Sequence, residues 1–106
     1  MLDYEKRNGT VRVRLAGELD HRRAEAIRPE LDSLIADPGV RRLEFDFSGL
    51  EFMDSSGIGM LIGRYKLMQD RGGSVAVMPG GRRVDRIMEL SGLYQIIEKL
   101  AWEVKS

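Results

Sequence analysis

The stretch LEFDFSGLEFMDSSGIGMLIGRYKLM, residues 43–68, passes from a strand pattern to a helix pattern. Its first residues alternate apolar and acidic side chains, with Leu43, Phe45 and Phe47 on one face, which predicts a half-buried strand. Its last residues keep the spacing of apolar side chains that is typical of an amphipathic helix. The polar turn Asp54–Gly57 therefore lies where a strand ends and a helix begins. The apolar positions of the helix are Ile58, Leu61, Ile62, Tyr65 and Met68.

Further strand and helix patterns precede this stretch. Leu2–Lys6 and Val11–Leu15 predict two strands, and Asn8-Gly9 between them is a strong signal for a tight hairpin. Apolar side chains then recur at helical spacing over His21–Ala36, and Asp20 directly before them is a good helix cap. Pro29 lies inside this helix, and because proline has no N–H to donate, we expect a bend or a locally lost hydrogen bond there.

Three more elements are expected after the central stretch. Val75–Met78 predicts a short apolar strand, Val84–Leu90 a third helix, and Tyr94–Ile97 a last short strand. The chain ends in a tail, Ala101–Ser106, that contains Trp102. Because strands alternate with helices, we expect an α/β fold in one domain: a mixed, mostly parallel sheet of four to five strands, with an antiparallel N-terminal hairpin and three main helices.

The composition excludes several classes of function. The chain contains no cysteine and only one histidine. This excludes disulfides, thiol catalysis and metal sites that need cysteines or two histidines. The 17 basic residues balance 17 acidic ones, whereas a nucleic-acid binder normally carries a basic excess. We therefore expect no metal, no cofactor and no direct nucleic-acid partner. With no secretory signal and no apolar run that could span a membrane, the sequence predicts a cytoplasmic domain without a membrane contact.

The turn Asp54–Gly57 is the first candidate site, because hydroxyls and free backbone N–H groups meet there at the positive end of a helix dipole. The residues alone leave four interpretations open. The turn is a helix cap, with Gly57 and Gly59 permitting close packing, or a phosphate-binding loop without the usual lysine. It is a phosphorylated switch, since a helix N-terminus stabilises a phosphoserine. Finally, the turn could carry the nucleophile of a serine hydrolase, although the GxSxG motif of such enzymes is missing and His21 would be the only imidazole base.

The segment Phe47–Gly73 resembles the signature of anti-sigma factor antagonists of the STAS superfamily. The resemblance extends to LAGELDH at Leu15–His21 and to MELSGL at Met88–Leu93, in matching order and without obvious insertions. The GELDH motif and the GRYK motif at Gly63–Lys66 are most similar to the sporulation-type antagonist of endospore-forming bacteria, and less to the general-stress type.

This resemblance implies a regulatory protein and not an enzyme. Members bind an anti-sigma factor that is also a serine kinase, and so release a sigma factor. The kinase uses ATP to phosphorylate the antagonist, which then dissociates, and a metal-dependent phosphatase of the PP2C type restores binding. The phosphorylated residue of the family is the serine directly after the aspartate, which here is Ser55. Asp20 matches the family's aspartate at the end of the second strand, beside the phosphorylation site.

The candidate partner-binding surface surrounds this serine. We expect Asp20 and Asp54 to lie close to Ser55, with Asp46 on the preceding strand, so that phosphorylation gathers negative charge on one surface. A helical wheel favours Ser56 over Ser55 as the exposed serine. A wheel assumes helical backbone angles, however, which residues at a helix cap do not have, so the choice of Ser55 rests on the resemblance. The surface comprises Asp20, His21, Asp54, Ser55, Ser56, Gly57, Ile58 and Gly59.

Two other functions remain as alternatives: a ligand-sensing STAS module that binds a nucleotide or lipid without a kinase, and a scaffold subunit of a large assembly.

The remaining polar residues are interpreted as ordinary surface residues. His21 is typical of a polar residue at a helix start, and Arg64 and Lys66 of a solvated helix face. The three basic residues Arg82, Arg83 and Arg86 also indicate a solvated face.

Overall fold

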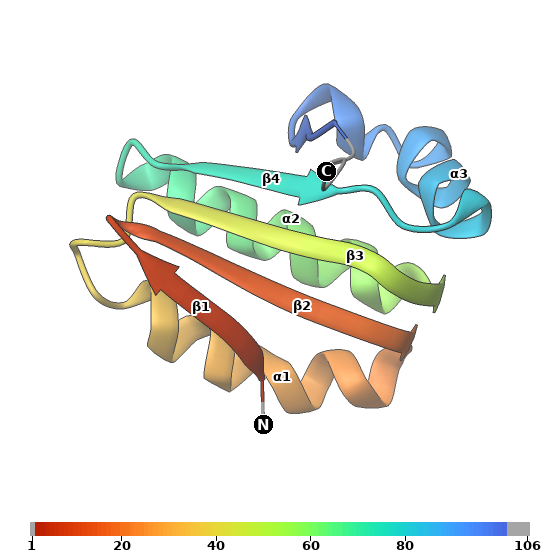
Figure 1. The fold of residues 1–106 in the computed structure, drawn as a ribbon, viewed down its shortest axis with the longest axis horizontal. Coiled ribbons are helices and arrows are strands. Elements are labelled where there is room, and N and C mark those ends of the chain that lie inside the picture. The colour runs from red at the N-terminus through yellow and green to blue at the C-terminus, as the bar shows by residue number, and fades with distance from the viewer. Residues whose placement is uncertain (1, 102–106) are drawn as a thin grey trace, which may run out of the picture.

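Two helices cover one face of a mixed sheet in the computed structural model, which describes residues 2–101 (Figure 1). Within those residues the sheet has five strands in the spatial order β1-β2-β3-β4-β5. The first two strands pair antiparallel, and the other neighbours pair parallel. The strands are β1 (Asp3–Arg7), β2 (Thr10–Leu19), β3 (Arg42–Met53), β4 (Ser74–Met78) and β5 (Glu98–Lys99).

The helices join the parallel strands as crossovers. Helix α1 (His21–Ile35) connects β2 to β3, and α2 (Ser55–Asp70) connects β3 to β4; both lie on the same face of the sheet (Figure 1). Helix α3 (Arg82–Leu90) follows β4, and a short 3-10 helix, η1 (Leu93–Gln95), leads into β5. This arrangement confirms the predicted α/β fold with its antiparallel hairpin and three main helices.

The hairpin between β1 and β2 follows from its two turn residues. Asn8 has φ 51° and Gly9 has φ 81°, the left-handed conformations that a two-residue hairpin turn requires. Arg7 and Thr10 form the first pair of the ladder beside the turn. The predicted hairpin is confirmed, and its two-residue turn fixes the register of the two strands.

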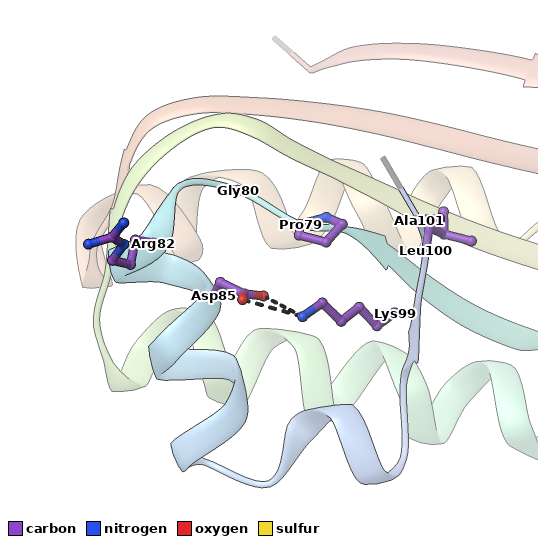
Figure 2. A pocket seen from close by; sticks show the side chains of 7 residues that line it. All are labelled: Pro79, Gly80, Arg82, Asp85, Lys99, Leu100 and Ala101. Atoms are coloured by element: carbon purple, nitrogen blue, oxygen red, sulfur yellow. Dashed lines mark hydrogen bonds and ion pairs between the residues drawn. The ribbon is translucent and has the colours of Figure 1, made fainter. Parts of the chain in front are cut away.

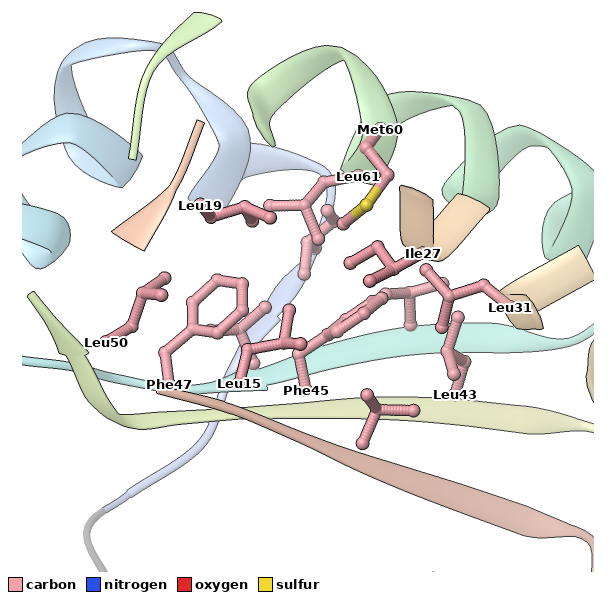
Figure 3. Packing of buried hydrophobic residues seen from close by; sticks show 14 of the residues in the cluster. Leu15, Leu19, Ile27, Leu31, Leu43, Phe45, Phe47, Leu50, Met60 and Leu61 are labelled. Carbon is pink, nitrogen blue, oxygen red and sulfur yellow. The ribbon is translucent and has the colours of Figure 1, made fainter. Parts of the chain in front are cut away.

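The hydrophobic core lies between the sheet and the two helices (Figure 3). Phe45 and Phe47 of β3 point into it, with ring centroids 5.8 Å apart, and Leu61 of α2 closes it from the helix side. On the opposite face of the sheet, β2 and β3 carry charged side chains at the alternate positions. Glu44 pairs there with Arg12 at 3.0 Å and with Arg42 at 2.7 Å.

Helix α1 continues through Pro29, where we expected a bend or a locally lost hydrogen bond. The assigned helix is unbroken from His21 to Ile35. Buried side chains on both sides of the proline, Ile27 and Leu31 among them, pack on the sheet and hold the helix together across the missing N–H.

The predicted strand Tyr94–Ile97 is wrong. Gly92, with φ 79°, starts the 3-10 helix Leu93–Gln95, and the last strand is Glu98–Lys99. Leu93 and Ile97 are both buried at a spacing of four residues, a period that suits a helical turn better than an extended strand. Apart from Ala101, the tail that contains Trp102 lies outside the described residues.

Candidate functional site

The carboxyl ends of β2 and β3 lie side by side, and this brings the two candidate segments together. Leu19 pairs with Met53 at the end of the parallel ladder, and the N–H of Asp54 donates to the carbonyl oxygen of Leu19 at 3.3 Å. Helices α1 and α2 therefore begin next to each other. In parallel sheets this edge is where functional groups gather.

Two aspartates cap the two helices: Asp20 as predicted, and Asp54 in agreement with one of the interpretations left open for its turn. Asp20 Oδ1 accepts from the N–H of Arg23 at 2.9 Å, and Asp54 Oδ1 accepts from the N–H of Ser56 at 2.9 Å. The second oxygen of Asp54, Oδ2, accepts from the N–H of His21 at 3.2 Å. One carboxylate thus bridges the N-termini of both helices, which fixes how they are placed relative to each other.

The two serines of α2 have different surroundings. Ser55 is exposed, and within residues 2–101 its hydroxyl makes no hydrogen bond. Ser56 is half-buried, and its Oγ lies 3.1 Å from Nδ1 of His21. The helical wheel, which favoured Ser56 as the exposed serine, is therefore wrong, because it takes no account of the neighbouring start of α1.

The two glycines of this turn have unequal roles. A Cβ at Gly57 would lie 2.5 Å from Cγ of Met53 and 3.1 Å from Cδ2 of Leu19, so only glycine lets α2 approach the strand ends this closely. A Cβ at Gly59 or Gly63 would meet nothing within 4 Å. Gly57 permits close packing as predicted, whereas no contact among the described residues requires a glycine at position 59.

A shallow groove of about 350 Å³ runs between α1 and α2 from this turn. Gly59 and Gly63 leave it open on the α2 side, and Ala24 lines it on the α1 side. His21 and Ser56 lie on its wall at the end next to Ser55. Its remaining lining residues are Glu25, Arg28, Met60 and Arg64.

Arg64 contradicts the prediction of a solvated helix face. Its side chain is only 9% exposed, and Nε lies 3.2 Å from Oδ1 of Asp32 on α1. Burial lowers the pKa of this guanidinium, and the charge of Asp32 opposes that effect. Its Nη1 has no hydrogen-bond partner in residues 2–101. Lys66, by contrast, is exposed as predicted.

Asp46 lies far from this site, although it is on the preceding strand as expected. It is eight positions before Asp54, which corresponds to roughly 25 Å along an extended strand. Its carboxylate pairs with Arg14 at 3.4 Å on the open face of the sheet. Asp54 adjoins the serines, and Asp20 directly precedes His21, whose ring contacts Ser56, whereas Asp46 lies away from them.

A second hollow, also about 350 Å³, lies at the end of β4 and the start of α3 (Figure 2). Asp85 and Lys99 are joined across it by an ion pair of 3.2 Å. Arg82 lines the hollow, and Arg83 and Arg86 are exposed on the same helix, in keeping with a solvated basic face. None of the residues that line it belongs to the candidate surface around Ser55.

The site lacks the arrangement of a hydrolase or a metal centre. His21 Nδ1 contacts Ser56 Oγ, but the nearby Asp54 carboxylate contacts the backbone N–H of His21, so no carboxylate orients the imidazole as in a catalytic triad. Among residues 2–101 no three His, Asp or Glu side chains are grouped so that they could hold a metal ion. In the same range no helix has the length and apolar character to cross a membrane.

The STAS domain family model matches residues 1–106, the whole of this chain. The chain belongs to the STAS family. This STAS domain is 38% identical, over 91% of its length and 82% of the relative's, to the anti-sigma F factor antagonist of Paenibacillus polymyxa. It is 30% identical, over 92% of its length and 87% of the relative's, to the anti-sigma-B factor antagonist of Bacillus subtilis.

Solved structures agree with this assignment. The unphosphorylated anti-sigma factor antagonist SpoIIAA superimposes on the STAS domain with a TM-score of 0.79 and 27% identity. The match covers 97% of this chain and 90% of that one. SpoIIAA in its phosphorylated form gives a TM-score of 0.75 at 29% identity, over 95% of this chain and 92% of that one. The family resemblance seen in the sequence is confirmed.

Proposed function

We propose that this STAS domain is an anti-sigma factor antagonist that phosphorylation of Ser55 switches off. It binds an anti-sigma factor with serine kinase activity and thereby frees a sigma factor. The exposure of Ser55 carries the proposal: its hydroxyl has no partner among residues 2–101, and it lies at the N-terminus of α2, directly after the capping Asp54. The relatives named as anti-sigma factor antagonists support the role, and a structure of a phosphorylated relative supports the switch.

In the proposed reaction this chain supplies only the hydroxyl that is phosphorylated, and the kinase supplies the nucleotide and the base. The Oγ of Ser55 attacks the γ-phosphorus of ATP held by the kinase; the new P–O bond forms as the bond to the β–γ bridging oxygen breaks, and ADP leaves. The hydroxyl proton passes to a base of the kinase. What the chain contributes is position, because α2 begins at Ser55 and the cap at Asp54 fixes its first turn.

The partner would dock on the start of both helices and on the groove between them. Asp20, His21 and Asp54 lie on the rim of this surface, and Ile58 is half-buried beside it. The open positions Gly59 and Gly63 allow a partner to approach the backbone of α2 closely. Of the eight residues that the sequence indicated, seven are exposed or half-buried and available to a partner, whereas Gly57 is buried beneath them.

The phosphate would break this contact through its charge. It adds about −1.5 to −2 charges beside Asp20 and Asp54, on a surface that faces the phosphates of the kinase's nucleotide. Two unit charges 6 Å apart at an effective dielectric near 40 repel by about 1.4 kcal/mol, and a doubly charged phosphate by about twice that. Repulsion of this size lowers affinity about a hundredfold. A PP2C-type phosphatase, which reaches the same exposed position, would restore binding.

Intact mass spectrometry tests the proposal directly. The wild-type chain, Ser55→Ala and Ser56→Ala are each incubated with ATP and each candidate anti-sigma factor kinase. We expect one phosphoryl group on the wild type and on Ser56→Ala, and none on Ser55→Ala. If no kinase modifies the folded wild type, the switch is wrong; a ligand-sensing module or a scaffold subunit then explains the domain better.

Binding to the same kinase provides the second measurement. Ser55→Ala should bind as the unmodified chain does and should not be released by ATP. Ser55→Asp should bind at least tenfold more weakly, because it places one charge where the phosphate would lie. Tight binding of Ser55→Asp, with the fold intact by circular dichroism, would rule out charge as the cause of release.

A further inference from the structure

Two serines stand side by side at the start of α2, and the proposed switch uses only one of them. Ser55 is exposed and its hydroxyl is unengaged within residues 2–101, whereas Ser56 is half-buried and its Oγ lies 3.1 Å from Nδ1 of His21. Both hydroxyls are within one helical turn of the same N-terminus, so the helix dipole does not distinguish them. The difference between them comes from α1.

A hydrogen bond from its backbone N–H fixes the position of His21. It is the first residue of α1, after the cap at Asp20, and its N–H donates to Oδ2 of Asp54 at 3.2 Å. The other oxygen of the same carboxylate accepts from the N–H of Ser56 at 2.9 Å. Asp54 therefore sets the distance between the residues that carry the imidazole and the hydroxyl.

We propose that His21 determines which serine is phosphorylated, because it keeps the hydroxyl of Ser56 turned toward α1. This inference rests on the proposed function. Phosphoryl transfer requires an Oγ in line with the bond between the γ-phosphorus and the leaving oxygen of ADP. Whichever of the two groups donates, Ser56 must give up its bond to His21 before its Oγ can take that position. Ser55 has no such hydrogen bond to break, so its Oγ forms the new P–O bond while its proton passes to a base of the kinase.

The test compares the site of phosphorylation in His21 variants of the full chain. The kinase is the one that phosphorylates the wild type, with ATP, and the phosphate is located by fragmentation mass spectrometry. In His21→Ala we expect the share of phosphate on Ser56 to rise about tenfold, the factor that corresponds to one hydrogen bond. His21→Asn, whose amide reaches near the position of Nδ1, should restore most of the wild-type preference.

Two further variants separate choice of serine from folding and docking. Arg22→Ala removes the next side chain of α1, which is exposed, and should leave the preference unchanged. In the double variant His21→Ala, Ser55→Ala, phosphorylation of Ser56 should be about tenfold faster than in Ser55→Ala alone, in which it is too slow to be detected in the time that the wild type needs. A folded double variant that stays unmodified, or a fall of Ser56 phosphorylation in His21→Ala, overturns the inference.

A measurement without the kinase checks the contact itself. The ¹⁵N shift of His21 Nδ1, followed by long-range ¹H–¹⁵N correlation, should change in Ser56→Ala and stay as in the wild type in Ser55→Ala. Equal shifts in all three proteins would show that the imidazole does not hold Ser56, and the inference would fail. Absence of phosphorylation in the wild type is a different result, since it removes the proposed function and leaves this contact measurable.

Discussion

Gly57 is the residue at which the candidate surface meets the core. A Cβ there would lie 2.5 Å from Cγ of Met53 and 3.1 Å from Cδ2 of Leu19, and both of these side chains are buried. Gly57→Ala should therefore lower the free energy of unfolding by about 1–3 kcal/mol, as overpacking of a filled core does. Urea denaturation followed by circular dichroism measures this change.

Gly59 provides the matched control, two residues further along the same helix. Because a Cβ at this position meets nothing within 4 Å, Gly59→Ala adds a methyl group without a clash. Alanine is the better helix former, so this variant should be more stable than the wild type by up to about 1 kcal/mol. If the two alanine variants had equal stabilities, the close contact at Gly57 would not limit the packing of α2.

At the scale of single residues, sequence reasoning succeeded where the chemistry is local. Asp20 was predicted as a cap, because an aspartate before a helical pattern accepts from a backbone N–H of the first turn, and a cap at the turn Asp54–Gly57 was one of the interpretations left open. Arg64 was missed, because its burial depends on Asp32 of a different helix. The engagement of Ser56 was missed for the same reason, since its partner His21 is 35 residues away.

At the scale of elements, a hydrogen bond joins a side chain of η1 to one of α3. The hydroxyl of Tyr94 donates to Oδ1 of Asp85 at 2.5 Å. Burial, and then the bond to Asp85, raises the pKa of Tyr94 above its ordinary value of 10.0. The fold therefore favours the neutral phenol, and this stabilisation is complete below pH 10 and is lost as the pH rises above it.

Tyr94→Phe should reveal this pH dependence. At pH 7 the variant should be less stable than the wild type by about 1.5–3 kcal/mol, the range for a hydrogen bond to a charged group. The difference should shrink above pH 10, where unfolding releases a proton from Tyr94 of the wild type. Urea unfolding at both pH values tests this, with Tyr65→Phe as the control, because the hydroxyl of Tyr65 makes no hydrogen bond within residues 2–101. A pH-independent difference would contradict the assignment.

The groove between α1 and α2 makes a prediction about binding. If the partner packs on it, a side chain at Gly63 should obstruct the partner and leave the fold intact, since a Cβ there meets nothing within 4 Å. We expect Gly63→Leu to weaken binding of the anti-sigma factor at least tenfold, with a melting temperature no lower than that of the wild type. Arg86→Leu adds the same side chain to an exposed position of α3 and should bind normally. Normal binding of Gly63→Leu would exclude the groove from the interface.

Element boundaries were predicted less well than element order. The alternation of apolar residues in β3 stops after Phe47, yet the strand continues to Met53. Two register shifts against β2 allow this, between Arg14 and Ala16 and between Gly17 and Glu18, and a simple period of two does not anticipate them. The longer strand matters, because it carries Asp54 to the end of the ladder beside Leu19.

At the scale of the whole molecule, the strand order of the sheet explains how the site is assembled, whereas the expectation that Asp20 lies beside the serine came from the family resemblance. Parallel neighbours end at the same edge of a sheet, so the residues after β2 and after β3 must lie together. The distance of Asp46 from this edge follows from the same geometry, because it pairs with Arg14 midway along the strands. The order of strands and helices along the chain does not predict the side-chain contacts between α1 and α2, because these depend on how closely the two helices pack.

The last prediction concerns the stability of the phosphorylated molecule. The phosphate would lie at the N-terminus of α2, where backbone N–H groups and the helix dipole favour negative charge by about 0.3–1 kcal/mol. Repulsion from Asp54 acts against this in solvent, and Ser55 is exposed, so no buried group is displaced. The phosphorylated chain should therefore melt no lower than the unmodified one. Calorimetry before and after phosphatase treatment measures both forms in one sample. A drop of more than about 5 °C, close to 1 kcal/mol for a domain of this size, would mean that the switch works by loosening the fold and not by repelling the partner.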